Sequence, residues 1–257
     1  MMASALADMV WPAIAARIGA GPLVVGINGP QGSGKSTLAA ALAARAAGEG
    51  VAAVTLSLDD LYWPRAVREV LAGNLHPLLA TRGVPGTHDV ALGLAVLAQL
   101  RAGAACARPR FDKGADDRSA PVHVPAGTRL VLFEGWCLGA PPQPAEDLLA
   151  PVNALEAGED PDGRWRAQVN GALAGAYQAL WQQIDLLVAL GAPDWPTVCR
   201  WRAEAEAAQL AASGRGMDAD TLARFMMHYE RLTRWQMQVM PGRADIAIAL
   251  DAARQPL

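Results

Sequence analysis

LVVGINGPQGSGKST, residues 23–37, is the stretch of sequence that decides the fold. Within it, Gly29, Gly34, Lys35 and Ser36 satisfy the pattern G-x-x-x-x-G-K-[ST] of a phosphate-binding loop. An apolar run precedes the pattern, and an alanine- and leucine-rich segment follows it, as in a strand–loop–helix unit. With the composition of this chain, the pattern arises by chance on the order of once in a thousand sequences. We therefore expect a nucleotide-binding site here.

This loop is expected to bind ATP and Mg²⁺. Glycines let the backbone wrap around phosphates with its N–H groups pointing inward, and the following helix adds its positive dipole end. Lys35 is expected to reach the outer phosphates and the Ser36 hydroxyl to ligate Mg²⁺. The candidate nucleotide-binding residues are Gly29, Pro30, Gln31, Gly32, Ser33, Gly34, Lys35, Ser36 and Thr37.

The rest of the chain alternates between apolar runs and helical patterns. Buried parallel strands are predicted at Leu23–Asn28, Val51–Leu58, Leu130–Phe133, Ile184–Leu190 and Ile246–Leu250. Helices are predicted over Ser36–Ala47, from the cap Asp89 to about Arg101, over Arg164–Gln183, over Trp195–Ala212 with Asp194 as its cap, and from about Asp218 to Met240. Together with the phosphate loop, this order predicts an α/β fold, the three-layer α/β/α P-loop NTPase, with a mostly parallel five-stranded sheet. We expect one domain over residues 1–257, with a packing helix over 1–20 and a helical lid over about 195–220.

Composition excludes several classes of protein. The 257 residues are 52% hydrophobic and 18% charged, which is typical of a globular chain, and a net charge of −3 gives no basic excess for nucleic acid. No run of 18 apolar residues predicts a membrane span. The three cysteines are too few and too scattered for a disulfide framework or a zinc site, and they favour a cytoplasmic protein with reduced thiols. The oligomeric state stays open.

Two predicted strands end in carboxylates near the phosphate loop. VTLSLDDLY, residues 54–62, places Asp59 and Asp60 at the carboxyl end of one strand, where an aspartate can accept a proton from an attacking hydroxyl. LVLFEGW, residues 130–136, ends in Glu134, a position suited to holding Mg²⁺ or its water. The alternatives are a turn or helix-capping aspartate and an ordinary acid after a strand.

A third candidate group is cationic and lies in the expected lid. Arg200 and Arg202 open a helix that leads into SGRGM, residues 213–217, and arginines on a mobile segment can neutralise transferring phosphate charge. The alternative is a solvated helix face with pairs such as Arg202–Glu206.

The acceptor is expected to bind in irregular stretches beyond the strand ends. These stretches are Leu61–His88 and Arg108–Thr128, whereas residues 140–163 predict a surface excursion. The candidate acceptor-binding residues in and beside them are Asp60, Arg82, His88, Arg110 and Lys113. Lys113 is one of only two lysines among 22 basic residues, the other being Lys35, which strengthens its candidacy. Arg82 has the alternative of pairing with a nearby acid, and His88 that of a structural hydrogen bond.

Six motifs in order resemble the D-glycerate 3-kinase family, a group of P-loop kinases related to uridine kinase, phosphoribulokinase and pantothenate kinase. They are GPQGSGKST, SLDDLY, RGVPGTHD, PRFDK, LFEGWCLG and RWRAEAE, spread over nearly the whole chain. The resemblance implies a mononucleotide-kinase-like parallel sheet, ATP as donor, and a small hydroxy acid, D-glycerate, phosphorylated on its 3-hydroxyl. It also implies that Asp59 is the catalytic base, Glu134 a magnesium-linked acid, and Arg200 and Arg202 lid residues.

Two other readings of the site remain open. A pantothenate-like or nucleoside-like acceptor would share Lys35, Asp59 and Glu134, but a nucleoside would need aromatic stacking rather than a cationic clamp. An ATP-hydrolysing switch would need no acceptor and no Asp59.

Overall fold

The computed structural model describes residues 2–19, 21–214 and 216–257. Five strands form one sheet in the order β2-β5-β1-β6-β7, and every neighbouring pair is parallel. The strands are β1 (Leu23–Asn28), β2 (Ala53–Ser57), β5 (Leu130–Gly135), β6 (Leu186–Gly191) and β7 (Ile246–Ala249). β1 and β5 are buried along their whole length, as expected of central strands with helices on both faces. The predicted five-stranded parallel sheet is confirmed.

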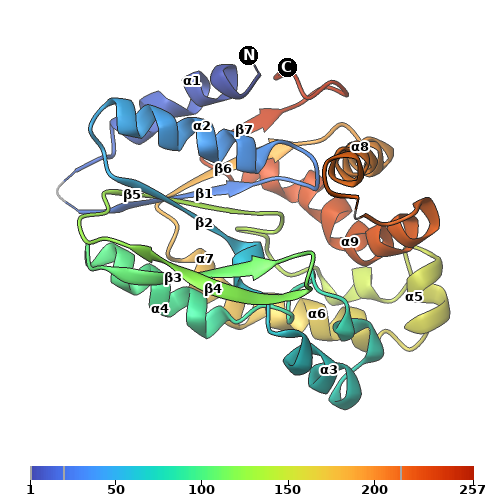
Figure 1. Cartoon of the computed structure of the whole chain (residues 1–257). Coiled ribbons are helices and arrows are strands. Elements are labelled where there is room, and N and C mark those ends of the chain that lie inside the picture. The colour runs from blue at the N-terminus through green and yellow to red at the C-terminus, as the bar shows by residue number, and fades with distance from the viewer. Residues whose placement is uncertain (1, 20, 215) are drawn as a thin grey trace.

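Helices cover both faces of this sheet (Figure 1). On one face, α1 (Met2–Ala15) and α2 (Lys35–Gly48) pack on the sheet through one apolar cluster. On the other lie α4 (Val90–Arg101), α6 (Arg164–Ala174), α7 (Ala176–Trp181) and α9 (Ala219–Val239), which share a second apolar cluster with β2 and β5. The three-layer architecture is therefore confirmed. The expected first helix ends at Ala15, and residues 1 and 20 lie outside the described part of the chain.

Two predicted helix starts are confirmed by their caps. The Asp89 side chain accepts a hydrogen bond from the Leu92 amide at 3.0 Å, and Asp194 accepts one from Thr197 at 2.7 Å. Asp194 begins α8 (Trp195–Ser213). Side-chain oxygens satisfy amide groups that have no partner within the helix itself, which is why aspartate marks these starts.

The helix predicted over Arg164–Gln183 is wrong as one element. It is two helices, α6 and α7, because the chain breaks at Gly175, whose φ of −98° and ψ of −113° are not helical.

The prediction of irregular acceptor stretches is also wrong in part. Residues 108–128 contain most of an antiparallel hairpin, β3 (Cys106–Asp112) and β4 (Asp117–Val124), which forms a second, two-stranded sheet. β4 is exposed over most of its length, and β3 has buried and exposed residues interspersed, so the apolar runs that mark the buried strands are missing. The stretch 61–88 contains α3 (Arg65–Asn74) and the short 3₁₀ helix η2 (Pro77–Ala80). The expected excursion at 140–163 carries η3 (Ala145–Leu148) and α5 (Ala154–Glu159).

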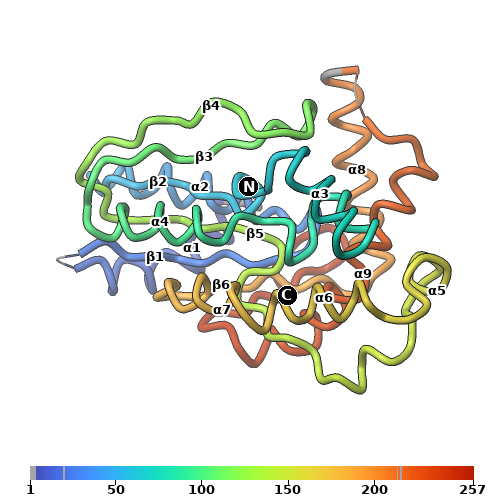
Figure 2. The backbone as a smooth tube through the Cα atoms, turned by 90° about the horizontal axis from the view of Figure 1, so that it is seen from below, coloured from blue at the N-terminus to red at the C-terminus, as the bar shows by residue number. Residues whose placement is uncertain are grey.

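These additions lie at the carboxyl end of the sheet. The tip of the β3–β4 hairpin reaches the same side of the molecule as α3 and as α8, which projects from the body of the protein (Figure 2). Parallel strands present their carboxyl ends and the loops that follow them to one edge, where ligands bind in open α/β sheets. A further 3₁₀ turn, η1 (Leu58–Leu61), follows β2 directly at this edge, and η4 (Met240–Gly242) ends α9.

Candidate active site

The phosphate loop joins β1 to α2 and is shaped by glycines. Gly34 precedes α2 with φ of 91°, and Gly32 has φ of 75°. A Cβ on Gly32 would lie 2.7 Å from the Trp201 Cβ, so the loop passes too close to α8 for any side chain there. Among the described residues, the buried Ser33 hydroxyl and the buried polar atoms of the Gln31 amide have no hydrogen-bond partner. A loop with unpartnered polar groups and a left-handed turn before a helix start fits an anionic phosphate ligand.

The adjacent aspartates of η1, Asp59 and Asp60, point in different directions and have different partners. The Asp60 carboxylate is buried and accepts a hydrogen bond from the Phe111 amide at 3.1 Å. Arg108 lies 3.5 Å and Arg110 3.8 Å from its oxygens. Asp60 thus anchors the β3–β4 hairpin to the sheet. Asp59 points the other way, into a cavity.

The Asp59 carboxylate has a partner on each oxygen. Lys113 Nζ lies 2.5 Å from Oδ2, and the Tyr62 hydroxyl donates to Oδ1 at 2.9 Å. Burial alone would raise the pKa of Asp59, but the charges of Lys113 and Lys35 and the two hydrogen bonds outweigh it and hold the pKa well below its usual value. The charge of Asp59 in turn raises the pKa of Lys113. The carboxylate is therefore charged at neutral pH and able to accept a proton.

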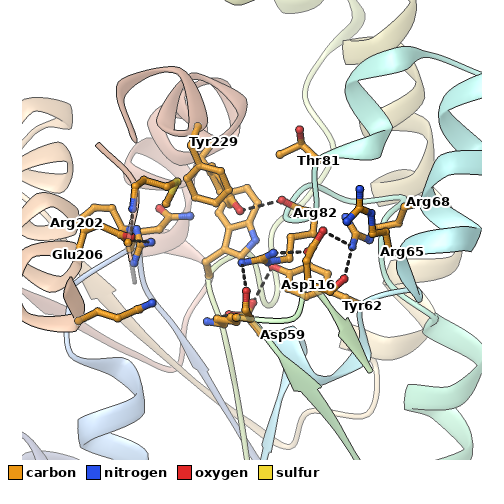
Figure 3. Close-up of a pocket in the computed structure, with 18 of the residues that line it drawn as sticks. Asp59, Tyr62, Arg65, Arg68, Thr81, Arg82, Asp116, Arg202, Glu206 and Tyr229 are labelled. Atoms are coloured by element: carbon orange, nitrogen blue, oxygen red, sulfur yellow. Dashed lines mark hydrogen bonds and ion pairs between the residues drawn. The ribbon is translucent and has the colours of Figure 1, made fainter. Parts of the chain in front are cut away.

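The cavity beside Asp59 has a volume of about 740 Å³ and is lined by side chains from many separate parts of the chain. Figure 3 shows Arg202 and Glu206 of α8 on one side and Arg68, Arg82 and Asp116 on the other. Lys35 of the phosphate loop lines the same cavity. A nucleotide phosphate on that loop and a small acceptor in the cavity would therefore meet beside Asp59.

One wall of the cavity is a cluster around Asp116 at the hairpin tip. Asp116 pairs with Arg82 and, at 2.9 Å, with Arg68. Arg68 is only 1% exposed and also donates to the Asp116 and Ala80 carbonyl oxygens. Asp116 has φ of 54°, an uncommon value for a residue with a side chain, and its several contacts hold it there. This cluster fixes the hairpin tip over the cavity.

Glu134 meets the requirements of a magnesium-linked acid. It lies near the carboxyl end of β5, and its backbone is in register with Ile27 of β1, just before the phosphate loop. Its side chain is buried, and among the described residues Oε2 has no hydrogen-bond partner. Burial raises the pKa of Glu134, while the charge of Lys35 opposes the shift. The described residues contain no cluster of three or more metal-binding side chains, but Mg²⁺ in kinases needs only one or two protein oxygens besides the phosphates. Glu134 and Ser36 fit that ion.

The acceptor-binding candidates divide into two groups. Lys113 and Arg82 line the cavity, with Arg82 engaged by Asp116 as its alternative reading proposed. Asp60, Arg110 and His88 do not line it. Asp60 and Arg110 pair with each other behind the cavity, so the structure gives them a role in holding the hairpin.

The candidate acceptor residue His88 is buried beneath Tyr62, with ring centroids 4.5 Å apart. Its Nδ1 lies 2.6 Å from the Tyr177 hydroxyl. Burial lowers the pKa of His88 to about 3. The ring is therefore a neutral packing group rather than a ligand for an anion, which is the alternative that the sequence left open.

The two expected lid arginines also separate. Arg202 lines the cavity and pairs with the buried Glu206, whose Oε1 accepts from the Met217 amide at 2.8 Å. Arg200 is exposed, reaches the Thr197 hydroxyl at 3.4 Å and does not line the cavity. Residues four apart share a helix face and residues two apart do not. Within the SGRGM stretch, residue 215 lies outside the described residues.

Sequence reasoning missed several residues of the cavity. Tyr62, Asp116 and Tyr229 line it. The ring of Tyr229 does pack against Trp136 at 4.9 Å, but its hydroxyl donates to the Arg82 carbonyl at the cavity edge. For Tyr62 a signal existed, because it stands three residues after Asp59 in a turn. Asp116 carried no signal in the sequence.

The chain is similar in sequence to known kinases. No model of a known protein family matches the chain. An uncharacterised kinase of Schizosaccharomyces pombe is 35% identical, over 92% of this chain and 90% of the relative. The chloroplastic D-glycerate 3-kinase of Arabidopsis thaliana is 30% identical over 92% of this chain, which spans only 54% of that enzyme.

Solved structures agree over almost the full length. The D-glycerate 3-kinase of Cryptococcus neoformans has a TM-score of 0.80 and 26% identity, covering 100% of this chain and 98% of that one. A possible uridine kinase of Bacillus stearothermophilus has a TM-score of 0.57 and 19% identity, covering 96% and 99%, which shows a shared fold. Across the described residues, no helix combines the length and apolar character that crossing a bilayer requires.

Proposed function

The chain belongs to the D-glycerate 3-kinase family of P-loop kinases, and from this premise we propose that it transfers the γ-phosphate of ATP to the 3-hydroxyl of D-glycerate. It is a phosphotransferase with an alcohol acceptor. The acceptor itself is the proposed part, because the relatives' names describe those proteins. We further propose that residues 1–257 act as one kinase domain in the cytoplasm, with α8 and the segment after it as a lid.

One observation carries the proposal: Asp59 shares a cavity with Lys35 and with the cationic side chains of Lys113 and Arg82. A cavity of this kind suits a small acid, whose carboxylate needs cationic partners and whose hydroxyl needs a base. A volume of about 740 Å³ leaves room for the outer phosphates of ATP beside an acceptor with a three-carbon backbone.

A nucleoside acceptor fits this lining less well. The aromatic rings at the cavity are engaged with one another or with buried neighbours. Tyr229 packs against both Trp136 and Phe225 with centroids 4.9 Å away, and Tyr62 is stacked on His88. Few ring faces remain for stacking on a base.

The proposed reaction requires one proton acceptor and a set of charges. Asp59 accepts the proton of the acceptor hydroxyl as its oxygen forms a bond to the γ-phosphorus. The bond from that phosphorus to the oxygen bridging it to the β-phosphate breaks, and its electron pair leaves with ADP. Lys35 and Arg202, which line the cavity, would neutralise the charge on the transferring group. Ser36 and Glu134 would hold Mg²⁺, which supplies further charge neutralisation when bound.

A coupled assay of ADP release with Mg-ATP tests the proposal. The panel is D-glycerate, L-glycerate, pantothenate, uridine and no acceptor. Release that depends on D-glycerate, with 3-phosphoglycerate as the product, is expected. Release with no acceptor would favour an ATP-hydrolysing switch, and dependence on another acceptor would replace D-glycerate with that compound.

Asp59→Asn separates a kinase from a switch. The variant should lose several orders of magnitude in kcat, since an amide cannot accept the proton, while its affinity for ATP stays near that of the wild type. An unchanged kcat would remove Asp59 from the mechanism.

A further inference from the structure

Both oxygens of the proposed base are already engaged. Oδ1 of Asp59 accepts from the Tyr62 hydroxyl, and Oδ2 lies 2.5 Å from Lys113 Nζ. An acceptor hydroxyl that is to be deprotonated by Asp59 must come within hydrogen-bond distance of one of these oxygens. Each carboxylate oxygen can accept a second hydrogen bond, but the Lys113 ammonium on Oδ2 opposes protonation of Asp59, so proton transfer is favoured when one of the two present partners leaves.

Lys113 is the partner that can move. The ring of Tyr62 is 3% exposed and is held between His88 and Phe111, with centroids 4.5 Å and 5.2 Å away. The Lys113 side chain is 57% exposed, at the end of β3 where the hairpin turns. A lysine ammonium on a four-carbon stem can swing between partners without any change in the backbone.

The backbone below Lys113 is fixed, so the swing needs no movement of the hairpin. Arg82 donates to the Lys113 carbonyl at 3.3 Å, and Asp112 accepts from the amides of Gly114 and Ala115. Asp116 ties the same tip to Arg68 and Arg82. Only the side chain of Lys113 therefore needs to move when its partner changes.

We propose that Lys113 is a gate on the catalytic base, which it leaves when the carboxylate of an anionic acceptor offers a second partner. This inference rests on the proposed function, because it assumes an acid acceptor in the cavity. The carboxylate of the acceptor replaces that of Asp59 as the partner of the ammonium, so the charge of Lys113 stays compensated throughout. Oδ2 of Asp59 is then free to face the acceptor hydroxyl.

The gate selects acids over neutral alcohols and over water. Glycerol presents the same hydroxyl but has no carboxylate. It therefore cannot replace Asp59 as the ion-pair partner of the Lys113 ammonium. Water is equally unable to do so. Hydrolysis would need the water oxygen to bond to the γ-phosphorus, its proton to go to Asp59 and ADP to leave with the electron pair of the broken bond. While Lys113 is paired with Asp59, its charge weakens Asp59 as a base, so hydrolysis of ATP is slow until an acid binds.

The first test observes Lys113 directly and needs no turnover. With only two lysines, [6-¹³C]lysine labelling gives two side-chain NMR signals, and Lys113→Met assigns them by removing one. With Mg-ADP present, D-glycerate should shift the Lys113 signal and glycerol should not. Asp59→Asn should shift it without any acceptor. If the chemical shift of the Lys113 signal does not change when D-glycerate is added, the proposal is overturned.

The second test looks for a gain of activity in Lys113→Met. The variant should release ADP without acceptor roughly tenfold faster than the wild type, and its kcat/KM should fall for D-glycerate and rise for glycerol. A lysine that only supports the hairpin would lower all three rates together. That result would contradict the gate.

Arg110→Met is the matched control for Lys113→Met. Arg110 lies on the same strand and is 46% exposed, but it faces Asp60 outside the cavity. The Arg110→Met variant should have the same selectivity for an acid over a neutral acceptor as the wild type. A gain of activity on glycerol in this variant would contradict the assignment of the gate to Lys113.

The panel of acceptors tested with the wild type separates the proposed function from the proposed gate. No transfer to D-glycerate defeats the proposed function, whereas transfer without any Lys113-dependent selectivity defeats the gate alone.

Discussion

The Tyr62 hydroxyl donates to Oδ1 of Asp59 at 2.9 Å, from a ring stacked on the buried His88. The proposed base is therefore oriented by a side chain that is itself held by aromatic packing on two sides. Such support keeps a carboxylate in one orientation toward the phosphate loop, and orientation is a large part of what a kinase active site contributes.

Tyr62→Phe removes this hydrogen bond and keeps the ring. Because the bond stabilises the charged form of Asp59, its loss should raise the pKa of that carboxyl. Asp59 must be deprotonated to act as base, so the acidic limb of the kcat profile, which reports the substrate complex that Lys113 has left, should move to higher pH, and kcat should fall about tenfold.

The measurement for Tyr62→Phe is a pH–rate profile with D-glycerate, paired with thermal unfolding. Unfolding should change little, because the stacking on His88 remains. An acidic limb at the wild-type position would show that Tyr62 does not act on Asp59.

Arg202 and Arg200 provide a matched pair on α8. Arg202→Lys keeps a positive charge beside the buried Glu206 but loses the planar guanidinium, so kcat should fall about tenfold with little loss of stability. Arg200→Lys should retain wild-type kcat, because Arg200 lies outside the cavity. Steady-state kinetics of both variants decide the matter, and equal losses would place both arginines in the reaction.

The sheet and the phosphate loop could be predicted because their signals are local. The loop residues from Gly29 to Ser36 form a fixed pattern, and buried parallel strands are continuous apolar runs. Asp194 and Asp89 could be predicted as caps for the same reason, since a cap depends on the next three residues.

Contacts between distant segments could not be predicted. Asp59 and Asp60 are neighbours with the same local sequence, and only a hairpin about 50 residues later distinguishes them. Phe111 and Arg108 engage Asp60, whereas Lys113 engages Asp59. The hairpin itself was hidden because its strands are largely exposed and so lack the apolar pattern of buried strands.

Gly83 lies against Tyr229 so closely that a side chain there has no room. A Cβ on Gly83 would lie 2.0 Å from the Tyr229 hydroxyl oxygen, and its φ of 138° is one that other residues rarely adopt. Gly83→Ala should therefore cost about 3 kcal/mol or more in the free energy of unfolding.

Gly103→Ala is the matched control for Gly83→Ala. Gly103 also has a positive φ, 64°, but nothing lies within 4 Å of its Cβ position. Only backbone strain remains, so the loss should be about 1 kcal/mol. Urea unfolding measures both variants, and equal losses would mean that the contact with Tyr229 relaxes easily.

His88 should make the stability of the protein depend on pH. Burial lowers its pKa from 6.5 in the unfolded chain to about 3 in the folded protein, so the unfolded state binds more protons between these values. The stabilising contribution of the neutral ring is fully present above about pH 6.5 and is lost as the pH falls toward 3.

Comparing wild type with His88→Gln isolates this contribution. Glutamine does not titrate, so from pH 7 to pH 5 the wild type should lose about 2 kcal/mol more in the free energy of unfolding than the variant. The variant will be less stable at pH 7, since it loses the stack on Tyr62 and the contact with Tyr177. That offset does not affect the test, because only the change with pH is compared. His228, whose pKa burial also lowers, is present in both proteins and cancels in the difference. Parallel curves for the two proteins would mean that folding leaves the pKa of His88 near its value in the unfolded chain.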